Sequence, residues 1–275
     1  MTRVLDLAWT ADGGRTSFRR HRYRWPYVVH RLFHPDPADP TRALTLVQSS
    51  GAGLQPGDHL RVGLQADPGV HTEVRGQGAT YVSGTPEGAP AQEHLTVEVA
   101  QGSAVVVDLA PRILTRHAHL VQDTDLIVAP GGAAAVVESF VIHPEAAGTT
   151  ELTYDASTRV FVAGEHDPVA IERQSLDGVH LLPSALGAFA TVLVAAPGHL
   201  PCPGCEVLLA RAARTPHAYA AASELPGGAG LVARLAARDG LLLRRGLADV
   251  TTALEEIVRH VREPATVPRK ELMTS

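Results

Sequence analysis

The feature that most constrains the fold is a two-residue alternation of apolar and polar side chains, which dominates from about residue 27 to residue 194. Residues 60–66 and 95–99 show it most clearly. Successive side chains of a β-strand point to opposite faces, so this period predicts half-buried strands. Further strands are expected at 27–33, 43–48, 70–75, 104–109, 126–129, 135–142, 158–162, 189–194 and 231–235.

Two stretches near the end of the chain have a helical period instead. Residues 203–214 place apolar side chains on one face after Pro203, which suits a first helical turn, and residues 248–262 carry a longer apolar stripe. We therefore predict a mainly β fold: a single domain, residues 1–275, of many short strands stacked in a coiled, β-helix-like or two-sheet arrangement, with two α-helices near the C-terminus. Its ordered core is expected at about 26–263, with 264–275 as a loose tail.

Two absences from the composition exclude whole chemistries. Lys270 is the only lysine, and asparagine does not occur. A phosphate-binding P-loop and a Schiff-base enzyme each need a lysine, and Lys270 lies in a polar stretch without a glycine-rich loop. The sequence therefore excludes phosphate-cradling NTPases and pyridoxal enzymes.

Charge and cysteine content indicate the compartment. The formal net charge is −5 and arginine is spread along the sequence, which predicts no nucleic-acid binding. Only Cys202 and Cys205 could form a disulfide, which favours a reducing compartment.

Asp6 interrupts the N-terminal apolar run before it reaches the length of a signal-peptide core. The apolar window 181–200 contains prolines and glycines, so a buried strand is expected there rather than a membrane span. The expected location is cytoplasmic.

Four side chains are candidate metal ligands. His117 and His119 would project from the same face if they lie in one strand, and imidazole suits Ni²⁺ or Zn²⁺. The alternative is that both are ordinary surface histidines. Cys202 and Cys205 form a CxxC at the start of the first predicted helix, where a thiolate would be favoured, but a complete zinc site needs two more ligands. A structural, metal-binding or redox role for this pair stays open.

The carboxylates include no pair that spacing alone identifies as an acid and base couple. They include Asp58, Glu73, Glu93, Asp108, Glu138, Asp155 and Glu165. One local pattern differs from the rest: Gly51, Gly53 and Gly57 lead directly to Asp58 at the start of a strand. The glycines predict a tight turn that ends in a carboxylate.

The order of several motifs resembles the urease accessory protein UreD family, called UreH in some species. The match begins with the turn Gly51–Asp58 and continues through residues 67–69, 77–82, 91–102 and 109–114 to Gln122. It resumes at LPGGAGLVARLAA, residues 225–237, and at PRK, residues 268–270. The family often has a GGLVGGD-type turn where this chain has GAGLQPGD, so the resemblance is to a divergent member.

The resemblance implies a coiled β fold with two helices and a role without catalysis. Members of the family resemble scaffolds that bind the urease apoprotein and, with UreF and the GTPase UreG, which is reached through UreF, promote nickel insertion into urease. A water-filled internal route for Ni²⁺ has been proposed for the family, and Asp58 is the position that matches its turn aspartate. The resemblance implies no tightly bound cofactor, only transient Ni²⁺, for which dispersed oxygen ligands suit release. The alternative function is a metal-dependent hydrolase on a β scaffold that uses His117 and His119.

Overall fold

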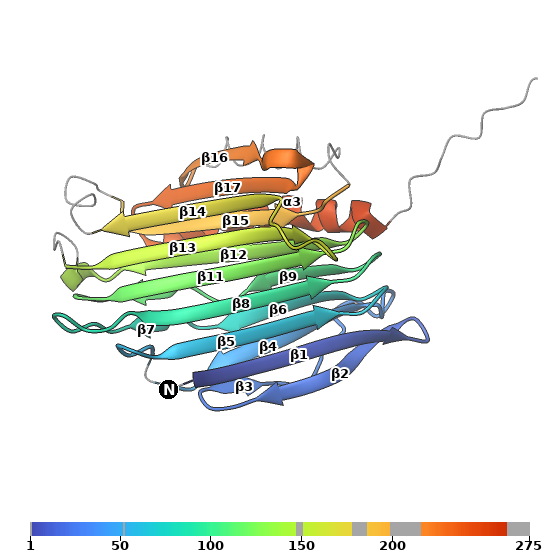
Figure 1. Ribbon diagram of the computed structural model, residues 1–275, viewed down its shortest axis with the longest axis horizontal. Helices are drawn as coiled ribbons and strands as arrows, with labels where there is room; N and C mark the ends of the chain where they lie inside the picture. Colours follow the sequence, from blue (N-terminus) through green and yellow to red (C-terminus); the bar gives the residue numbers. More distant parts are fainter. Residues whose placement is uncertain (1, 52, 147–150, 178–185, 199–215, 263–275) are drawn as a thin grey trace, which may run out of the picture.

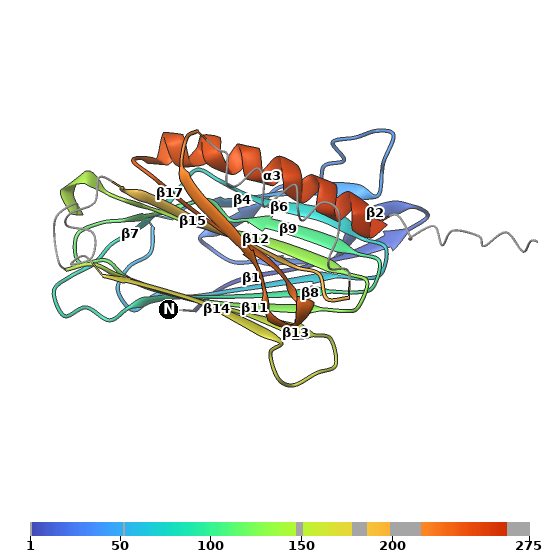
Figure 2. The same ribbon diagram turned by 90° about the horizontal axis from the view of Figure 1, so that it is seen from above.

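The computed structural model describes residues 2–51, 53–146, 151–177, 186–198 and 216–262. Its strands form two sheets that face each other, as Figures 1 and 2 show. Sheet A consists, in order across the sheet, of β14 (Ala170–Asp177), β13 (Thr153–Val162), β11 (His119–Val128), β8 (Ala91–Val99), β5 (His59–Ala66), β1 (Thr2–Asp12) and β2 (Arg15–Tyr23).

Sheet B lies opposite. It consists, in order, of β16 (Tyr219–Glu224), β17 (Gly230–Ala237), β15 (Ala188–Ala195), β12 (Ala133–Ile142), β9 (Ala104–Asp108), β6 (His71–Gln77), β4 (Arg42–Ser49) and β3 (Tyr27–Val29). The short strands β7 (Thr80–Val82) and β10 (Arg112–Leu114) join sheet B through a pairing of β10 with β12. The helical elements among the described residues are α3 (Gly240–Arg262) and the 3-10 turns η1 (Pro144–Ala146) and η2 (Pro226–Gly228).

The chain coils back and forth between the sheets. From β4 to β13 it passes repeatedly from sheet B to sheet A, and each new strand runs parallel to its neighbour in the same sheet. A parallel neighbour requires a crossover, and here the crossover is a strand of the other sheet. The stacking is therefore β-solenoid-like, which confirms the predicted mainly β, coiled fold.

The apolar phase of the strands faces the space between the sheets. One continuous cluster of buried side chains runs from Leu5 on β1 to Val232 on β17. The cluster begins well before residue 26, where the ordered core was expected to start, since Leu5, Leu7 and Trp9 are fully buried. The predicted boundary missed β1 and β2, which close one side of the stack as an antiparallel hairpin.

The helical prediction needs correction at its start. The helix α3 begins at Gly240, eight residues before the predicted position, because the Asp239 carboxylate accepts hydrogen bonds from the amides of Leu241 and Leu242, both at 2.9 Å. Gly240 and Gly246 obscure this start in the sequence. The first predicted helix, 203–214, and the tail, 264–275, lie outside the described residues.

The helix covers part of the outer face of sheet B. It packs along β17, β15 and β12, where Leu243 and Val250 are buried (Figure 2). No helix in the described part of the chain is long and apolar enough to cross a membrane. The apolar window around residue 190 forms β15, a central strand of sheet B, as the sequence predicted.

Candidate functional site

The described part of the glycine turn, residues 53–58, leads into β5 and is bridged to β7 by the pairing of Leu54 with Val82. Gly53 and Gly57 have φ angles of +102° and +76°, which favour glycine. The Asp58 carboxylate accepts a hydrogen bond from the Gln55 amide at 3.0 Å, while the Asp58 amide donates to the Gln55 carbonyl at 3.0 Å. This aspartate therefore holds the turn closed, a structural contribution that the glycine pattern predicted.

The two candidate histidines do not share a strand. His117 lies in the turn before β11 with a φ of +61°, and His119 begins β11. The His117 Nδ1 atom lies 3.3 Å from a carboxylate oxygen of Glu151. The expectation of two imidazoles on one strand face therefore fails, because the turn interrupts the alternation. Cys202 and Cys205 lie outside the described residues.

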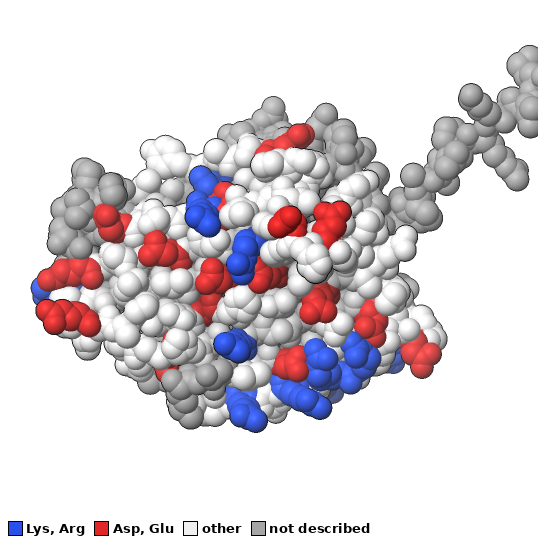
Figure 3. Space-filling model, in the orientation of Figure 1, with Lys and Arg blue, Asp and Glu red and all other residues white. Residues whose placement is uncertain are grey.

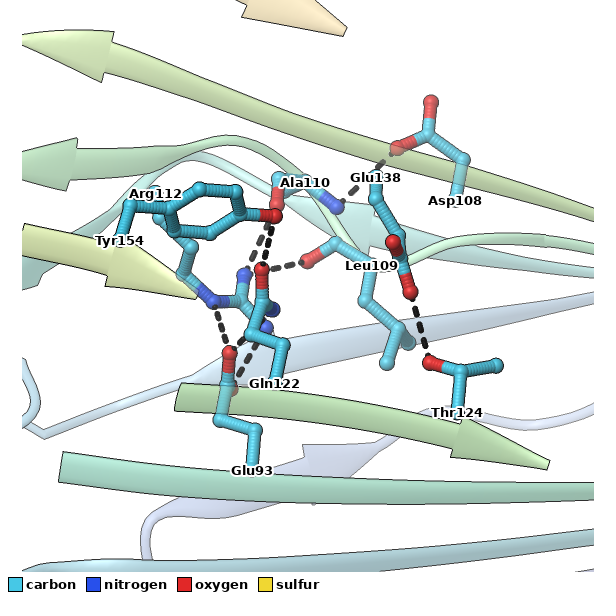
Figure 4. Close-up of polar contacts among 9 residues, drawn as sticks. All are labelled: Glu93, Asp108, Leu109, Ala110, Arg112, Gln122, Thr124, Glu138 and Tyr154. Atoms are coloured by element: carbon cyan, nitrogen blue, oxygen red, sulfur yellow. Dashed lines mark hydrogen bonds and ion pairs between the residues drawn. The ribbon is translucent and has the colours of Figure 1, made fainter. Parts of the chain in front are cut away.

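The most unusual chemistry in the described structure lies between the sheets. Arg112, at the start of β10, forms a two-pronged ion pair with Glu93 on β8, with nitrogen to oxygen distances of 2.8 and 2.7 Å. Gln122 on β11 donates to the same carboxylate at 2.7 Å, and the Tyr154 hydroxyl donates to Gln122 at 2.7 Å (Figure 4). Arg112 and Glu93 are 7% and 9% exposed, so this charged pair lies within the core.

The backbone beside Arg112 is shaped to receive its charge. The Arg112 Nη1 atom donates to the Ala110 carbonyl at 2.8 Å, and Ala110 has a φ of +75°, a conformation that a non-glycine residue seldom adopts. Burial opposes the charged guanidinium, but the attraction and hydrogen bonds of Glu93 outweigh it and raise the pKa of Arg112. Arg112 therefore stays charged.

A second carboxylate lies close by. Glu138, on β12, accepts a hydrogen bond from the Thr124 hydroxyl at 2.6 Å (Figure 4). Burial raises the pKa of the Glu138 carboxyl, and the nearby Glu93 charge adds to the shift. Glu93, Arg112, Gln122 and Glu138 all line one small cavity of about 40 Å³. The cavity has the size for very few water molecules.

The residues of the ion pair also line a second cavity. This space of about 20 Å³ is lined by Glu93 and Arg112 together with Gly53 and Leu54. The glycine turn thus borders this second cavity, whereas Asp58 is not among the lining residues of either cavity. Of the four predicted turn residues, Gly53 alone lines one of these two cavities.

Further polar side chains lie between this network and an edge of the sheets. Gln174 on β14 lies in register with Ala156 and, through it, with Gln122, and it accepts a hydrogen bond from the Thr191 hydroxyl at 3.2 Å. Glu172, also on β14, pairs with Arg234 of β17 across the gap between the sheets. Three carboxylates, those of Glu93, Glu138 and Glu172, therefore follow one another from the interior toward the sheet edge.

Sequence reasoning named Glu93 and Glu138 only as scattered carboxylates. A usable signal was present: Glu93 occupies the apolar phase of its strand, between Ala91 and Leu95, and Glu138 interrupts a strand that is apolar on both faces, between Val136 and Phe140. A glutamate at such a position must point into the core and requires a partner. Arg112 and Gln122 were quoted only for the resemblance, since their partners lie far away in the sequence.

The arrangement offers oxygen atoms rather than a closed metal centre. Among the described residues, no group of three or more His, Cys, Asp or Glu side chains is placed to hold a metal ion. The carboxylates of Glu93 and Glu138 are separate, and each already accepts hydrogen bonds. Such oxygen atoms can contact a passing cation weakly and one after another.

Glu138→Gln is expected to change how stability depends on pH. Because the folded protein holds the Glu138 proton to a higher pH than the unfolded chain, the wild type loses stability as the pH rises from the unfolded pKa through the raised folded pKa. The glutamine variant lacks this loss. Urea unfolding at a series of pH values should show the variant gaining relative stability above that window, and a constant difference at every pH would contradict the buried, titrating carboxyl.

Comparison with known proteins identifies the family. The sequence model of the UreD urease accessory protein family matches residues 2–271. The chain is 35% identical over 248 residues to the urease accessory protein UreD of Mycolicibacterium smegmatis, which covers 88% of this chain and 86% of that protein. It is 34% identical over 256 residues to urease accessory protein UreD 2 of Bradyrhizobium sp. (strain ORS 278), covering 92% and 89%. The chain, with its coiled pair of sheets, belongs to the UreD urease accessory protein family.

Proposed function

We propose that the protein is a non-catalytic scaffold for urease maturation: it binds the urease apoprotein in the cytoplasm and, with UreF and the GTPase UreG, promotes nickel insertion. The observation that carries this proposal is the family match over nearly the whole chain. The lone lysine, Lys270, agrees with a division of labour in which another subunit binds and hydrolyses GTP.

The buried polar side chains between the sheets support an internal route for Ni²⁺. Ni²⁺ would be the cargo, passing the carboxylates of Glu93 and Glu138 between the sheets. A cation in transit needs ligands that bind and release it, and single carboxylates suit this better than a closed cluster of thiolates and imidazoles. We propose Glu138 as the main contact, because the carboxylate of Glu93 is already held by Arg112.

Glu138→Gln is expected to lower the nickel content and activity of urease several-fold while the protein still co-purifies with its partners. The substitution removes a charge but keeps an oxygen for the Thr124 hydrogen bond. The measurement is complementation of a deletion strain, with nickel per urease active site as the readout. Glu98→Gln is the matched control, because Glu98 lies exposed on β8 of the facing sheet, sheet A, and points away from the interior.

Two outcomes would contradict the proposal. Normal nickel loading of urease in the deletion strain would remove the role in maturation. Normal loading by Glu138→Gln would remove the interior route while leaving the scaffold role. Asp58→Ala belongs in the same series. A loss of nickel loading without a loss of folded protein would indicate that Asp58 also takes part in the nickel route.

A further inference from the structure

One edge of sheet A combines free backbone groups with exposed charged and aromatic side chains. Within the part of the chain that the structure describes, the strand β2 ends the sheet, with β1 on one side and no strand on the other. Its first part is covered, because the Thr16 amide donates to the Pro40 carbonyl at 3.3 Å and the Thr16 hydroxyl to the Thr41 carbonyl at 2.6 Å. Its second part, His21–Tyr23, has no such cover among the described residues.

The amide of Tyr23 points out of the sheet. The Arg24 amide donates to the Val4 carbonyl of β1 at 3.1 Å, so the two chains form a hydrogen-bonded pair there. In an antiparallel ladder the next pair, Tyr23 with Leu5, is not hydrogen-bonded, and its amides point away from the partner strand. Tyr23 can therefore donate to a strand that is added to this edge.

The side chains along this edge are of the types that bind proteins tightly. The segment Arg22–Trp25 alternates two exposed arginines with Tyr23 and Trp25, which are 42% and 57% exposed. Arginine, tyrosine and tryptophan are enriched among the residues that dominate binding energy at interfaces. Neither Arg22 nor Arg24 forms an ion pair with a described residue, in contrast to Arg19 and Arg20 on the same strand.

The strand is held in place from the core outward. Rings follow one another along it, from buried Trp9 to Phe18 at 6.0 Å, from Phe18 to His21 at 4.5 Å, and from His21 to Tyr23 at 5.4 Å between centroids. A strand fixed in this way loses little conformational entropy when a partner binds. Figure 3 shows Lys and Arg atoms gathered along the side where Figure 1 places β2, although the chain as a whole is acidic.

We propose that residues 21–25 form a docking edge, at which an acidic, extended segment of a protein partner adds to sheet A as a further strand. The outward amide of Tyr23 would pair with a segment in extended conformation, and the two arginines, Arg22 and Arg24, would attract acidic side chains on it. The assignment rests on the proposed function for the identity of the partner, which is the urease apoprotein or UreF.

The test uses the full chain and the two purified partner proteins, each titrated separately. Arg22→Glu/Arg24→Glu is expected to weaken binding of one partner about tenfold or more and to reduce the salt dependence of its Kd. The control is Arg173→Glu/Arg238→Glu, which reverses two exposed arginines away from β2, one of them on the opposite edge strand of sheet A. Its affinity should stay within about twofold of wild type, since remote surface charges contribute little.

A second pair of variants separates backbone pairing from side-chain contact. Tyr23→Ala removes the ring, whereas Tyr23→Pro also removes the outward amide and keeps the internal ladder, since proline is tolerated on an edge strand. We expect Tyr23→Pro to bind the partner several-fold more weakly than Tyr23→Ala does. The two variants should have equal thermal stability, which checks that both are folded.

The outcomes are distinct. If the Arg22→Glu/Arg24→Glu variant binds its partners with the same affinity as the wild type, the docking edge is overturned and the proposed function stands. Equal affinities for Tyr23→Pro and Tyr23→Ala would overturn strand addition. Absence of wild-type binding to both partners would overturn the proposed function and the docking edge with it.

Discussion

Replacing Arg112 with methionine is expected to lower the free energy of unfolding by about 3–5 kcal/mol, the usual cost of removing one partner of a buried ion pair. The Glu93 carboxylate would remain 9% exposed within the core without its counter-charge. Only the Gln122 amide would still donate to it among the side chains of this network. Chemical denaturation at neutral pH measures the change, provided that the unfolding slope stays constant.

The matched control for this experiment is Arg116→Met. Arg116 forms an exposed ion pair with Glu151 at 2.9 Å, and surface pairs contribute about 0–1 kcal/mol. A further variant, Arg112→Met with Glu93→Leu, removes both charges and should recover part of the loss, because an apolar pair needs no compensation. An Arg112→Met effect no larger than that of Arg116→Met would show that the interior pair is not desolvated as described.

The second large effect is expected for Gly53→Ala, with a loss of about 3 kcal/mol in the free energy of unfolding. A β-carbon at Gly53 would lie 2.4 Å from the Tyr81 carbonyl oxygen, and the φ of +102° disfavours any side chain. The same carbonyl accepts the Leu54 amide at 2.8 Å, so the backbone cannot move away without breaking a bridge between the turn and β7.

Gly57→Ala is the control within the same turn. Gly57 also has a positive φ, of +76°, but the nearest atom to its added β-carbon is the Ala89 β-carbon at 4.0 Å. The expected cost is the conformational one alone, about 1–2 kcal/mol. Equal losses for the two variants would contradict the close approach at Tyr81. Because Gly53 lines the cavity beside Glu93 and Arg112, nickel loading should fall in Gly53→Ala beyond what its lower stability explains.

Most of the fold could be predicted because its signal is local. The alternation of residues 60–66 and 95–99 was enough to assign β5 and β8, and the predicted strand 135–142 matches most of β12, a strand buried on both faces. The strand β14 was missed because it is an edge strand with polar side chains on both faces, so its residues show no apolar phase.

The interior network could be predicted only in part. The position of Glu93 in the apolar phase of β8 shows in the sequence that its side chain points inward. The strand β12 is apolar on both faces, so the sequence shows that Glu138 lies in a buried strand but not which face it points to. The hydrogen-bond partners of Glu93 and Glu138 cannot be identified from the sequence. Arg112 reaches Glu93 because β10 and β8 lie in opposite sheets, and Thr124 reaches Glu138 for the same reason.

The sequence by itself determined most of the central strands, the turn glycines and the family, because these depend on backbone conformation and on the order of motifs. The tertiary structure alone decided which carboxylate meets which cation and which strand ends a sheet. Glu93 and Arg112 are brought together, and β2 is left as an edge, by the way the chain coils between its sheets. That coiling follows from packing across the whole core, which no local pattern of residues encodes.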